Sequence, residues 1–170
     1  MLEIVNNLEP FFEDCYRIVS VREYARLIKK SPPTASKLLK GFAQEGYLHK
    51  RPERGHLLFS LDQTNEEVTA LCKMYWTGRL VTFTEELKKR TVGASAVLFG
   101  SLSKAEVKRD SDVDIAVFSP EKKTLDISPI EKRMGRKISI QWFTSLRGIK
   151  NEHLLNNILN GMILLGKVKW

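Results

Sequence analysis

The chain is poor in cysteine and contains no long apolar run. Its 170 residues include only two cysteines, Cys15 and Cys72, and neither has the spacing to another cysteine or to a histidine that is typical of zinc sites or disulfide frameworks. We therefore expect two reduced, buried thiols. No apolar run approaches the roughly 18 residues of a membrane span, so we expect no membrane contact.

The first residues also lack the basic segment that begins a secretory signal peptide. They carry acids instead, namely Glu3, Glu9, Glu13 and Asp14. Together with the lack of a disulfide pattern, this predicts a cytoplasmic protein. The composition is that of a globular chain, with 42% hydrophobic and 28% charged residues, and the length suits one domain or two small ones.

Positive charge is in excess, and much of the excess is local. The formal net charge is +8 and the isoelectric point is near 9.5. Between Ser20 and Leu61 the chain has nine lysines and arginines but only three acids. This distribution predicts contact with a polyanion, although a basic surface that is simply solvated is the alternative.

Two helices are predicted between residues 20 and 45. Apolar residues recur at helical spacing over 20–30, and Ser20 is a suitable N-cap. The segment Ser31-Pro32-Pro33 ends this helix and begins a second one over 32–45, because proline is tolerated in a first helical turn. Gly46 then ends the second helix as a left-handed cap.

Two short strands, 47–51 and 56–61, are predicted next, around a turn at 52–55. Helix, turn, helix and hairpin in this order resemble a winged helix-turn-helix, to which residues 2–19 would add a packing helix. The resemblance implies that the second helix enters the major groove of double-stranded DNA and that the hairpin tip contacts the backbone or minor groove. The residues that it would bring to DNA are Thr34, Ser36, Lys37, Lys40, Lys50, Arg51 and Arg54. The alternative is a domain that makes only protein contacts.

The most informative segment is 97–118. An apolar run ends in Gly100-Ser101, ten residues follow, and Asp112-Val113-Asp114 opens a second apolar run. Residues two apart on a strand leave the same face of a sheet, so both carboxylates point the same way. Two carboxylates held this close repel each other unless a cation lies between them, and such oxygen ligands suit Mg²⁺. A glycine that admits a phosphate and a serine hydroxyl complete a predicted site for a metal-bound nucleoside triphosphate.

This segment resembles the nucleotidyltransferase superfamily related to DNA polymerase beta, and in particular its minimal members. Gly100, Ser101, Asp112 and Asp114 match the Gly-Ser and Asp-x-Asp motif of that family in order and spacing. Lys104-Ala105 replaces the usual Arg-Gly, which keeps a cation and loses a glycine. The resemblance implies catalytic, metal-binding roles for the two aspartates and nucleotide contacts from Gly100, Ser101 and Lys104. The implied cofactors are Mg²⁺ and ATP or another NTP.

Strands alternate with helices in the C-terminal half, which predicts a small α/β domain with a mixed sheet. The predicted strands are 94–99, 113–118, 137–143 and 162–165, and the predicted helices are 125–134 and 151–160. The full prediction is an α+β chain with a winged helix-turn-helix at 1–62, a helical connector at 63–90 that breaks near Gly78, and a minimal nucleotidyltransferase domain at 91–170.

One acid of the family pattern is missing. The family carries a third carboxylate on a later strand, and here the matching segment is Lys137-Ile138-Ser139-Ile140, with Ser139 at the acidic position. Gln141, two residues on, is neutral as well. Hydroxyl and amide oxygens bind Mg²⁺ more weakly than carboxylate does, so nucleotide binding is a firmer expectation than turnover.

Two functions follow from this pattern and remain open. In the first, the chain binds Mg-NTP and transfers NMP to a protein or RNA hydroxyl. In the second, it is a DNA-binding regulator, or an antitoxin that represses its own operon, with a degenerate transferase domain that senses a nucleotide. An adaptor with neither activity is the third alternative. The nucleotidyltransferase resemblance also implies a HEPN-type toxin as a partner, and the winged-helix resemblance implies a homodimer that matches a two-fold operator.

Overall fold

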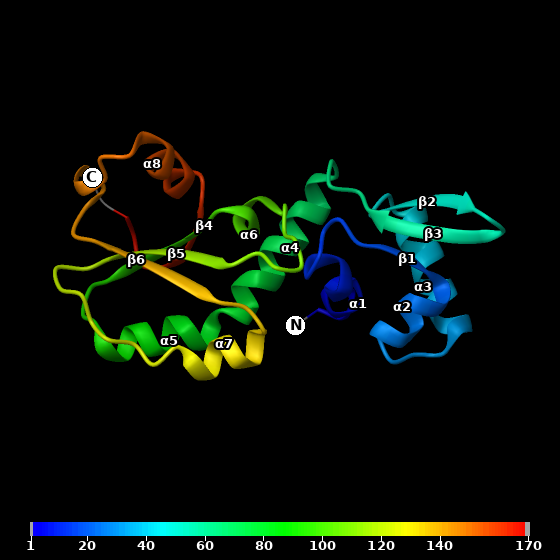
Figure 1. Ribbon diagram of the computed structural model, residues 1–170, viewed down its shortest axis with the longest axis horizontal. Helices are drawn as coiled ribbons and strands as arrows, with labels where there is room; N and C mark the ends of the chain where they lie inside the picture. Colours follow the sequence, from blue (N-terminus) through cyan, green and yellow to red (C-terminus); the bar gives the residue numbers. More distant parts are fainter. Residues whose placement is uncertain (1, 169–170) are drawn as a thin grey trace. The chain divides into compact units, whose positions relative to one another are not determined.

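The computed structural model describes residues 2–168 and divides them into two compact units (Figure 1). Unit 1 holds the described residues up to Tyr75 together with Ala105–Arg109. Unit 2 holds Trp76–Lys104 and the described residues from Asp110 onward. Within residues 2–168, no helix combines the length and the apolar character that a membrane span requires.

Unit 1 combines helices with a three-stranded antiparallel sheet whose strand order is β1-β3-β2. Its elements follow along the chain as α1 (Glu3–Phe12), β1 (Ile18–Ser20), α2 (Val21–Leu27), α3 (Pro32–Gln44), β2 (Leu48–Glu53) and β3 (His56–Leu61). The next helix, α4 (Glu66–Arg79), begins in unit 1 and continues into unit 2.

The starts of α2 and α3 form as the sequence predicts. Ser20 and Glu23 make a capping box in which each side chain bonds to the other residue's backbone N–H. Ser31 caps α3 through the backbone N–H of Thr34, and two prolines occupy its first turn. Gly46 follows α3 with a φ of +79°, a left-handed conformation that glycine adopts without strain.

The predicted helix over 2–19 is wrong in its second half. Helix α1 ends at Phe12, and Ile18–Ser20 instead form strand β1, which pairs with β3. Asp14 makes the turn between them, since its side chain accepts a hydrogen bond from the Tyr16 N–H at 3.2 Å. The β-branched pair Ile18-Val19 then gains a strand partner that lies about forty residues away in the sequence.

The hairpin turn is tighter than the predicted turn at 52–55. Strand β2 extends to Glu53, which pairs with His56, so only Arg54 and Gly55 form the loop. Their φ angles are +46° and +79°, as in a type I′ turn. Pro52 is tolerated within the ladder because β2 is an edge strand.

Unit 2 is built on a four-stranded mixed sheet with strand order β6-β5-β4-β7. Strands β4 and β5 pair antiparallel, as do β4 and β7, whereas β5 and β6 are parallel. The elements are α5 (Val81–Arg90), β4 (Ser95–Phe99), α6 (Ser101–Lys104), β5 (Val113–Phe118), α7 (Ser128–Met134), β6 (Ile138–Phe143), the 3-10 turn η1 (Leu146–Gly148), α8 (Glu152–Leu159) and β7 (Met162–Leu165).

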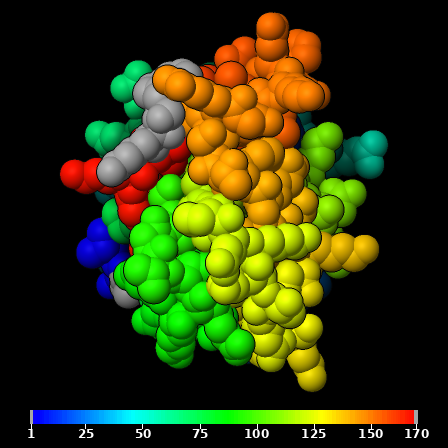
Figure 2. Space-filling view, turned by 90° about the vertical axis from the view of Figure 1, so that its left-hand side faces the viewer, coloured from blue at the N-terminus to red at the C-terminus, as the bar shows by residue number. Residues whose placement is uncertain are grey.

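Helices cover both faces of this sheet, as its buried central strands require. Figure 1 shows α8 on one face and α5 with α7 on the other, and Figure 2 shows α5 and α7 side by side. Residues of β4 and β5 pack with η1 and α8 in one buried cluster that includes Val97, Phe99, Ala116 and Ile158. Strand β4 is buried along its whole length.

The predicted strands of unit 2 are confirmed to within one residue at each end. Helix α7 begins at Ser128 rather than at 125, because Pro129 sets its first turn. The connector forms two helices that part at Leu80, two residues after Gly78. Both cysteines are buried, as expected, and they do not form a disulfide with each other.

One segment from within the 97–118 motif belongs to unit 1. Val107 accepts a hydrogen bond from the Cys15 N–H at 2.8 Å, and the Lys108 ammonium lies 5.9 Å from the centre of the Tyr16 ring. The ten-residue spacer between Gly100-Ser101 and Asp112 is therefore held by contacts that its own sequence does not reveal.

Candidate functional site

Gly100 and Asp114 lie against each other at the ends of neighbouring strands. Phe99, the last residue of β4, pairs with Asp114 of β5, and the chain then turns at Gly100, whose φ is +75°. A Cβ at this glycine would lie 2.8 Å from Oδ2 of Asp114, closer than such atoms approach. Glycine is therefore required at position 100 for two reasons: its backbone is in the left-handed region, and the Asp114 carboxylate occupies the space that a side chain would need.

Asp112 and Asp114 form the predicted pair of carboxylates. Asp112 is exposed just before β5, and Asp114 is half-buried within it. Partial burial, with a further contribution from the charge of Asp112, raises the pKa of Asp114. The fold therefore holds two acids close enough to repel, which is an arrangement that a cation between them would stabilise.

Ser139 occupies the position beside Asp114 that the sequence assigns to it. The parallel register of β5 and β6 pairs the two residues, and the Ser139 hydroxyl donates a hydrogen bond to the Asp114 carboxylate. Gln141 pairs with Ala116, one step farther along the same face. Among residues 2–168, no group of three His, Cys, Asp or Glu side chains is arranged to hold a metal ion.

These donors fit one divalent cation whose remaining ligands come from outside the protein. Asp112 and Asp114 supply two carboxylate groups, Asp114 is already destabilised as an anion, and Ser139 adds only a neutral oxygen. A Mg²⁺ ion usually takes one or two protein carboxylates together with water and phosphate oxygens, and this set supplies that number. Two ions would need further anionic ligands.

The other two residues predicted to contact the nucleotide, Ser101 and Lys104, are the first and last residues of α6. Ser101 begins α6, directly after Gly100, and is partly buried. Lys104, at the end of α6, donates a hydrogen bond from Nζ to Oδ1 of Asn157 on α8 at 3.1 Å. Ser103 donates to the Gly100 carbonyl at 2.8 Å and so fixes the turn. The structure therefore brings Gly100 against Asp114, with Ser101 next to it in the chain, and places Lys104 against α8.

Sequence reasoning missed Arg136. Its side chain is buried, with 7% of its surface exposed, and Nη1 donates to the Ser111 carbonyl at 2.6 Å. The guanidinium also lies 5.1 Å from the centre of the Trp76 ring, a cation–π contact. Because Ser111 directly precedes Asp112, Arg136 fixes the backbone from which the first carboxylate projects. A charged residue just before a predicted strand was the available signal.

In unit 1, the residues predicted to contact DNA lie on two elements. Thr34, Lys37 and Lys40 are exposed on α3, whereas Ala35, Leu39 and Phe42 face the core. Lys40 and Lys50 line the same shallow hollow between α3 and β2. Arg51 pairs with Glu53 at 3.0 Å, so part of its charge is already balanced. Ser36 is partly buried on α3, and Arg54 is exposed in the hairpin turn.

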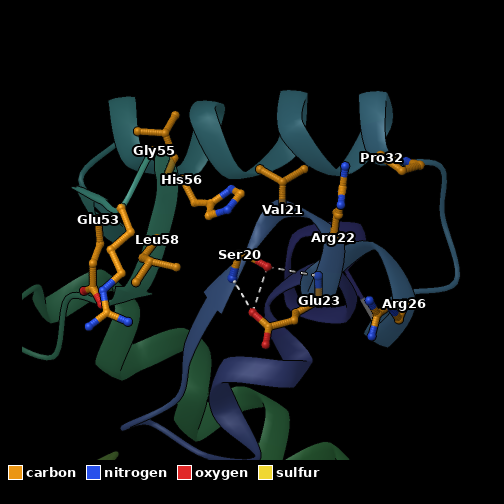
Figure 3. A pocket seen from close by; sticks show the side chains of 12 residues that line it. Ser20, Val21, Arg22, Glu23, Arg26, Pro32, Glu53, Gly55, His56 and Leu58 are labelled. Atoms are coloured by element: carbon orange, nitrogen blue, oxygen red, sulfur yellow. Dashed lines mark hydrogen bonds between the residues drawn. The ribbon is translucent and has the colours of Figure 1, made fainter.

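A second hollow of unit 1 lies between α2, the start of α3 and the β2–β3 hairpin (Figure 3). Its volume is about 650 Å³. Most of its charged lining comes from three arginines, two glutamates and a histidine: Arg22, Arg26, Arg54, Glu23, Glu53 and His56. Of these, only Arg54 belongs to the set that the sequence predicts for DNA.

One comparison with known proteins gives a match. A family model described as "Nucleotidyltransferase domain" matches residues 80–165, about half of the chain. This range contains Gly100, Ser101, Asp112, Asp114 and Ser139. No curated protein matches the chain, and no solved structure does.

Proposed function

The chain belongs to the nucleotidyltransferase domain family, and on this premise we propose that Asp112 and Asp114 bind a nucleoside triphosphate together with one Mg²⁺ ion. The observation that carries the proposal is the juxtaposition of two repelling carboxylates with Gly100, whose missing side chain leaves the space that the Asp114 carboxylate occupies. When bound, the ion would neutralise charge on the triphosphate and on the two carboxylates.

The protein's own residues would then hold the triphosphate. Gly100 lets a phosphate approach the backbone, and the Ser101 hydroxyl offers a hydrogen bond at the same turn. The hydrogen bond from Ser139 favours the ionised form of Asp114 and opposes part of the rise in its pKa that burial and the charge of Asp112 cause. Burial of Ile115 and Ala116 anchors the strand that carries both acids.

Transfer of NMP to a protein or RNA hydroxyl is a second candidate function. The complete set of Gly100, Ser101, Asp112 and Asp114 favours it, as does membership of the family. The serine at position 139 disfavours it, because activation of the attacking hydroxyl would lack a carboxylate. Nucleotide binding without transfer is therefore the primary proposal.

We propose further that unit 1 acts as a winged helix that binds double-stranded DNA. The order of α2, α3 and the β2–β3 hairpin supports this, as do the exposed cations on α3 and the hairpin. The combined function would be a DNA-binding regulator that senses Mg-NTP. A homodimer and a HEPN-type toxin partner are part of the same proposal, and they are tested by the molar mass in solution and by co-purification from the native host.

An assay with labelled NTPs separates the two candidate functions. The protein and its Asp112→Asn/Asp114→Asn variant are incubated with labelled ATP, CTP, GTP or UTP, Mg²⁺ and candidate protein or RNA acceptors. Binding that is lost in the variant, without label transfer, supports the sensor. Label transfer that requires both aspartates supports the enzyme, and absence of binding and transfer alike contradicts both.

DNA binding has a separate test. In retardation of a promoter fragment, Lys37→Ala/Lys40→Ala is expected to weaken binding at least tenfold, because each lysine supplies part of the salt-dependent attraction to phosphates. The control is Lys88→Ala/Lys89→Ala, which removes the same charge from α5 of unit 2. Equal retardation by both variants and the wild type would contradict a DNA-reading role for α3.

A further inference from the structure

Three basic side chains around the second hollow of unit 1 have no ion-pair partner among the described residues. Within the described residues, Arg22, Arg54 and His56 make no ion pair and no side-chain hydrogen bond. They come from both walls, Arg22 from α2 and the other two from the hairpin. Cationic and donor groups that converge on a concavity from separate elements are the usual construction of an anion site.

The acids in the lining form no ion pair with these three side chains. The Glu23 carboxylate is committed to the capping box, since it accepts from the Ser20 N–H at 2.7 Å and from the Ser20 hydroxyl at 2.8 Å (Figure 3). Glu53 pairs with Arg51, which lies outside the lining. Both acids therefore have partners of their own.

The hairpin turn presents Arg54 at a conformational cost. A type I′ turn requires positive φ at both central positions, and Asn, Asp or Gly is favoured at the first of them. Arg54 stands there with a φ of +46°. A β-carbon makes this conformation unfavourable, and residues held in it often serve a binding role.

We propose that this hollow binds a phosphate group, with Arg22, Arg54 and His56 as its ligands. The apolar side chains of Val21, Leu57 and Leu58 also line it, so a phosphate that carries a sugar and a flat ring suits it better than a bare ion. The volume of about 650 Å³ is in the range of sites for small organic ligands. The phosphate can come from a free nucleotide or from a nucleic-acid backbone. The inference is independent of the Asp112–Asp114 site and extends the DNA-binding part of the proposed function.

Two variants test the site with little risk of unfolding. Arg54→Asn supplies a residue that the turn favours, and Arg22→Ala removes a cation from the first turn of α2, where a positive charge opposes the helix dipole. Both variants are expected to be at least as stable as the wild type. The matched controls are Arg133→Asn and Arg147→Ala, two exposed arginines of unit 2.

The first arm measures AMP binding by calorimetry in EDTA, so that no metal-dependent site contributes. Wild type and controls are expected to bind AMP, and Arg54→Asn and Arg22→Ala to lose at least about tenfold in affinity. The second arm measures the salt dependence of binding to a short DNA duplex. There the double variant is expected to lower the slope of log K against log salt by about two, with no change in the controls.

Each outcome decides the inference. Loss of AMP binding assigns the site to a free nucleotide, and a reduced slope alone assigns it to the DNA backbone. If AMP binding and the slope are unchanged in both variants, or if the wild type binds neither ligand, the inference is overturned. If Lys37→Ala/Lys40→Ala loses DNA binding while the Arg22 and Arg54 variants bind AMP and DNA as the wild type does, the proposed DNA binding would stand and this phosphate site would not. If the wild type binds AMP but not DNA, and the Arg22 and Arg54 variants lose AMP, this site would stand and the DNA-binding part of the proposed function would be contradicted.

Discussion

The acidic pair of unit 2 and the basic side chains around the hollow of unit 1 lie in different surroundings. Asp112 lies just before strand β5 and Asp114 lies within it, and Gly100 and Ser139 lie against Asp114. Arg22, Arg54 and His56 are exposed side chains on a helix and a hairpin. The first arrangement is rigid and suits a small cation, whereas the second suits a larger anion to which long side chains adapt.

The rigidity of the acidic site is tested most strongly at Gly100. In Gly100→Ala the new Cβ would lie 2.8 Å from Oδ2 of Asp114, so the carboxylate must move. We expect a loss of Mg-ATP affinity on the order of 100-fold, measured by calorimetry.

Gly93→Ala is the control, because Gly93 has a similar φ of +70° and no atom within 4 Å of its Cβ position. It carries the same backbone cost without the clash, so its affinity should stay close to that of the wild type. Equal losses in the two variants would mean that backbone strain alone is responsible.

Removal of the Arg136 side chain should destabilise the backbone just before Asp112 in the same site. Arg136→Met leaves the Ser111 carbonyl without its 2.6 Å donor, and we expect a loss of about 2–3 kcal/mol in the free energy of unfolding, measured with urea. Exposed Arg133→Met should change it by less than about 0.5 kcal/mol. Arg136→Lys keeps a donor and should recover part of the loss. No recovery and no difference from Arg133→Met would show that Arg136 does not position Asp112.

Ser139→Asp adds a third carboxylate to the acidic site and should increase the contrast in charge between the two sites. We expect Mg²⁺ affinity to rise about tenfold, and the metal-free protein to be less stable, because three acids then repel one another. Isothermal titration with Mg²⁺ and thermal unfolding in EDTA measure the two effects. Gln141→Asp places an acid one step farther along the same face and should give a smaller gain. An equal gain at both positions would contradict a specific role for residue 139.

The smallest effect concerns the stability of the metal-free protein. The pKa of Asp114 is raised in the folded state, so its ionisation destabilises the fold as pH rises above the usual value of 3.8 and through the raised pKa. Asp114→Asn should therefore be more stable than the wild type in EDTA at pH 7, and the difference should vanish at acidic pH. The gain should be below about 1 kcal/mol because water still reaches the carboxylate, and that is at most about 4 °C in Tm.

The same measurement compares the two sites. Arg54→Asn also removes one member of a like-charged cluster, and it should raise stability by up to about 1 kcal/mol through the turn alone. Mg²⁺ should raise the Tm of wild type and Arg54→Asn but not that of Asp114→Asn. A Mg²⁺ response that survives in Asp114→Asn would contradict the assignment of the metal to this pair.

Much of the acidic site is predictable from the sequence, because its parts are local. The spacing of Gly100, Asp112 and Asp114 indicates two strands separated by a ten-residue spacer, and the apolar segment 137–143 indicates a strand that brings Ser139 beside Asp114. Arg136 is not predictable in this way, since its partners Ser111 and Trp76 come from other elements.

The basic hollow depends on contacts that are distant in the sequence. Arg22 and His56 line one hollow because β1 pairs with β3, and the prediction of a helix through Val19 excluded that pairing. The spacer residues Ala105–Arg109 also belong to unit 1 through a contact that is distant in the sequence, the backbone hydrogen bond from the Cys15 N–H to the Val107 carbonyl. Local periodicity has no information about either contact.

The central claim is that Asp112 and Asp114 bind a metal-escorted triphosphate. The most direct test is calorimetric titration with ATP, CTP, GTP and UTP at neutral pH, in Mg²⁺ and in EDTA, of the wild type and Asp112→Asn/Asp114→Asn. We predict that the wild type binds at least one NTP in Mg²⁺ at least tenfold more tightly than in EDTA, and that the variant loses this difference. Binding of equal strength with and without Mg²⁺, or binding that the variant keeps, would contradict the claim.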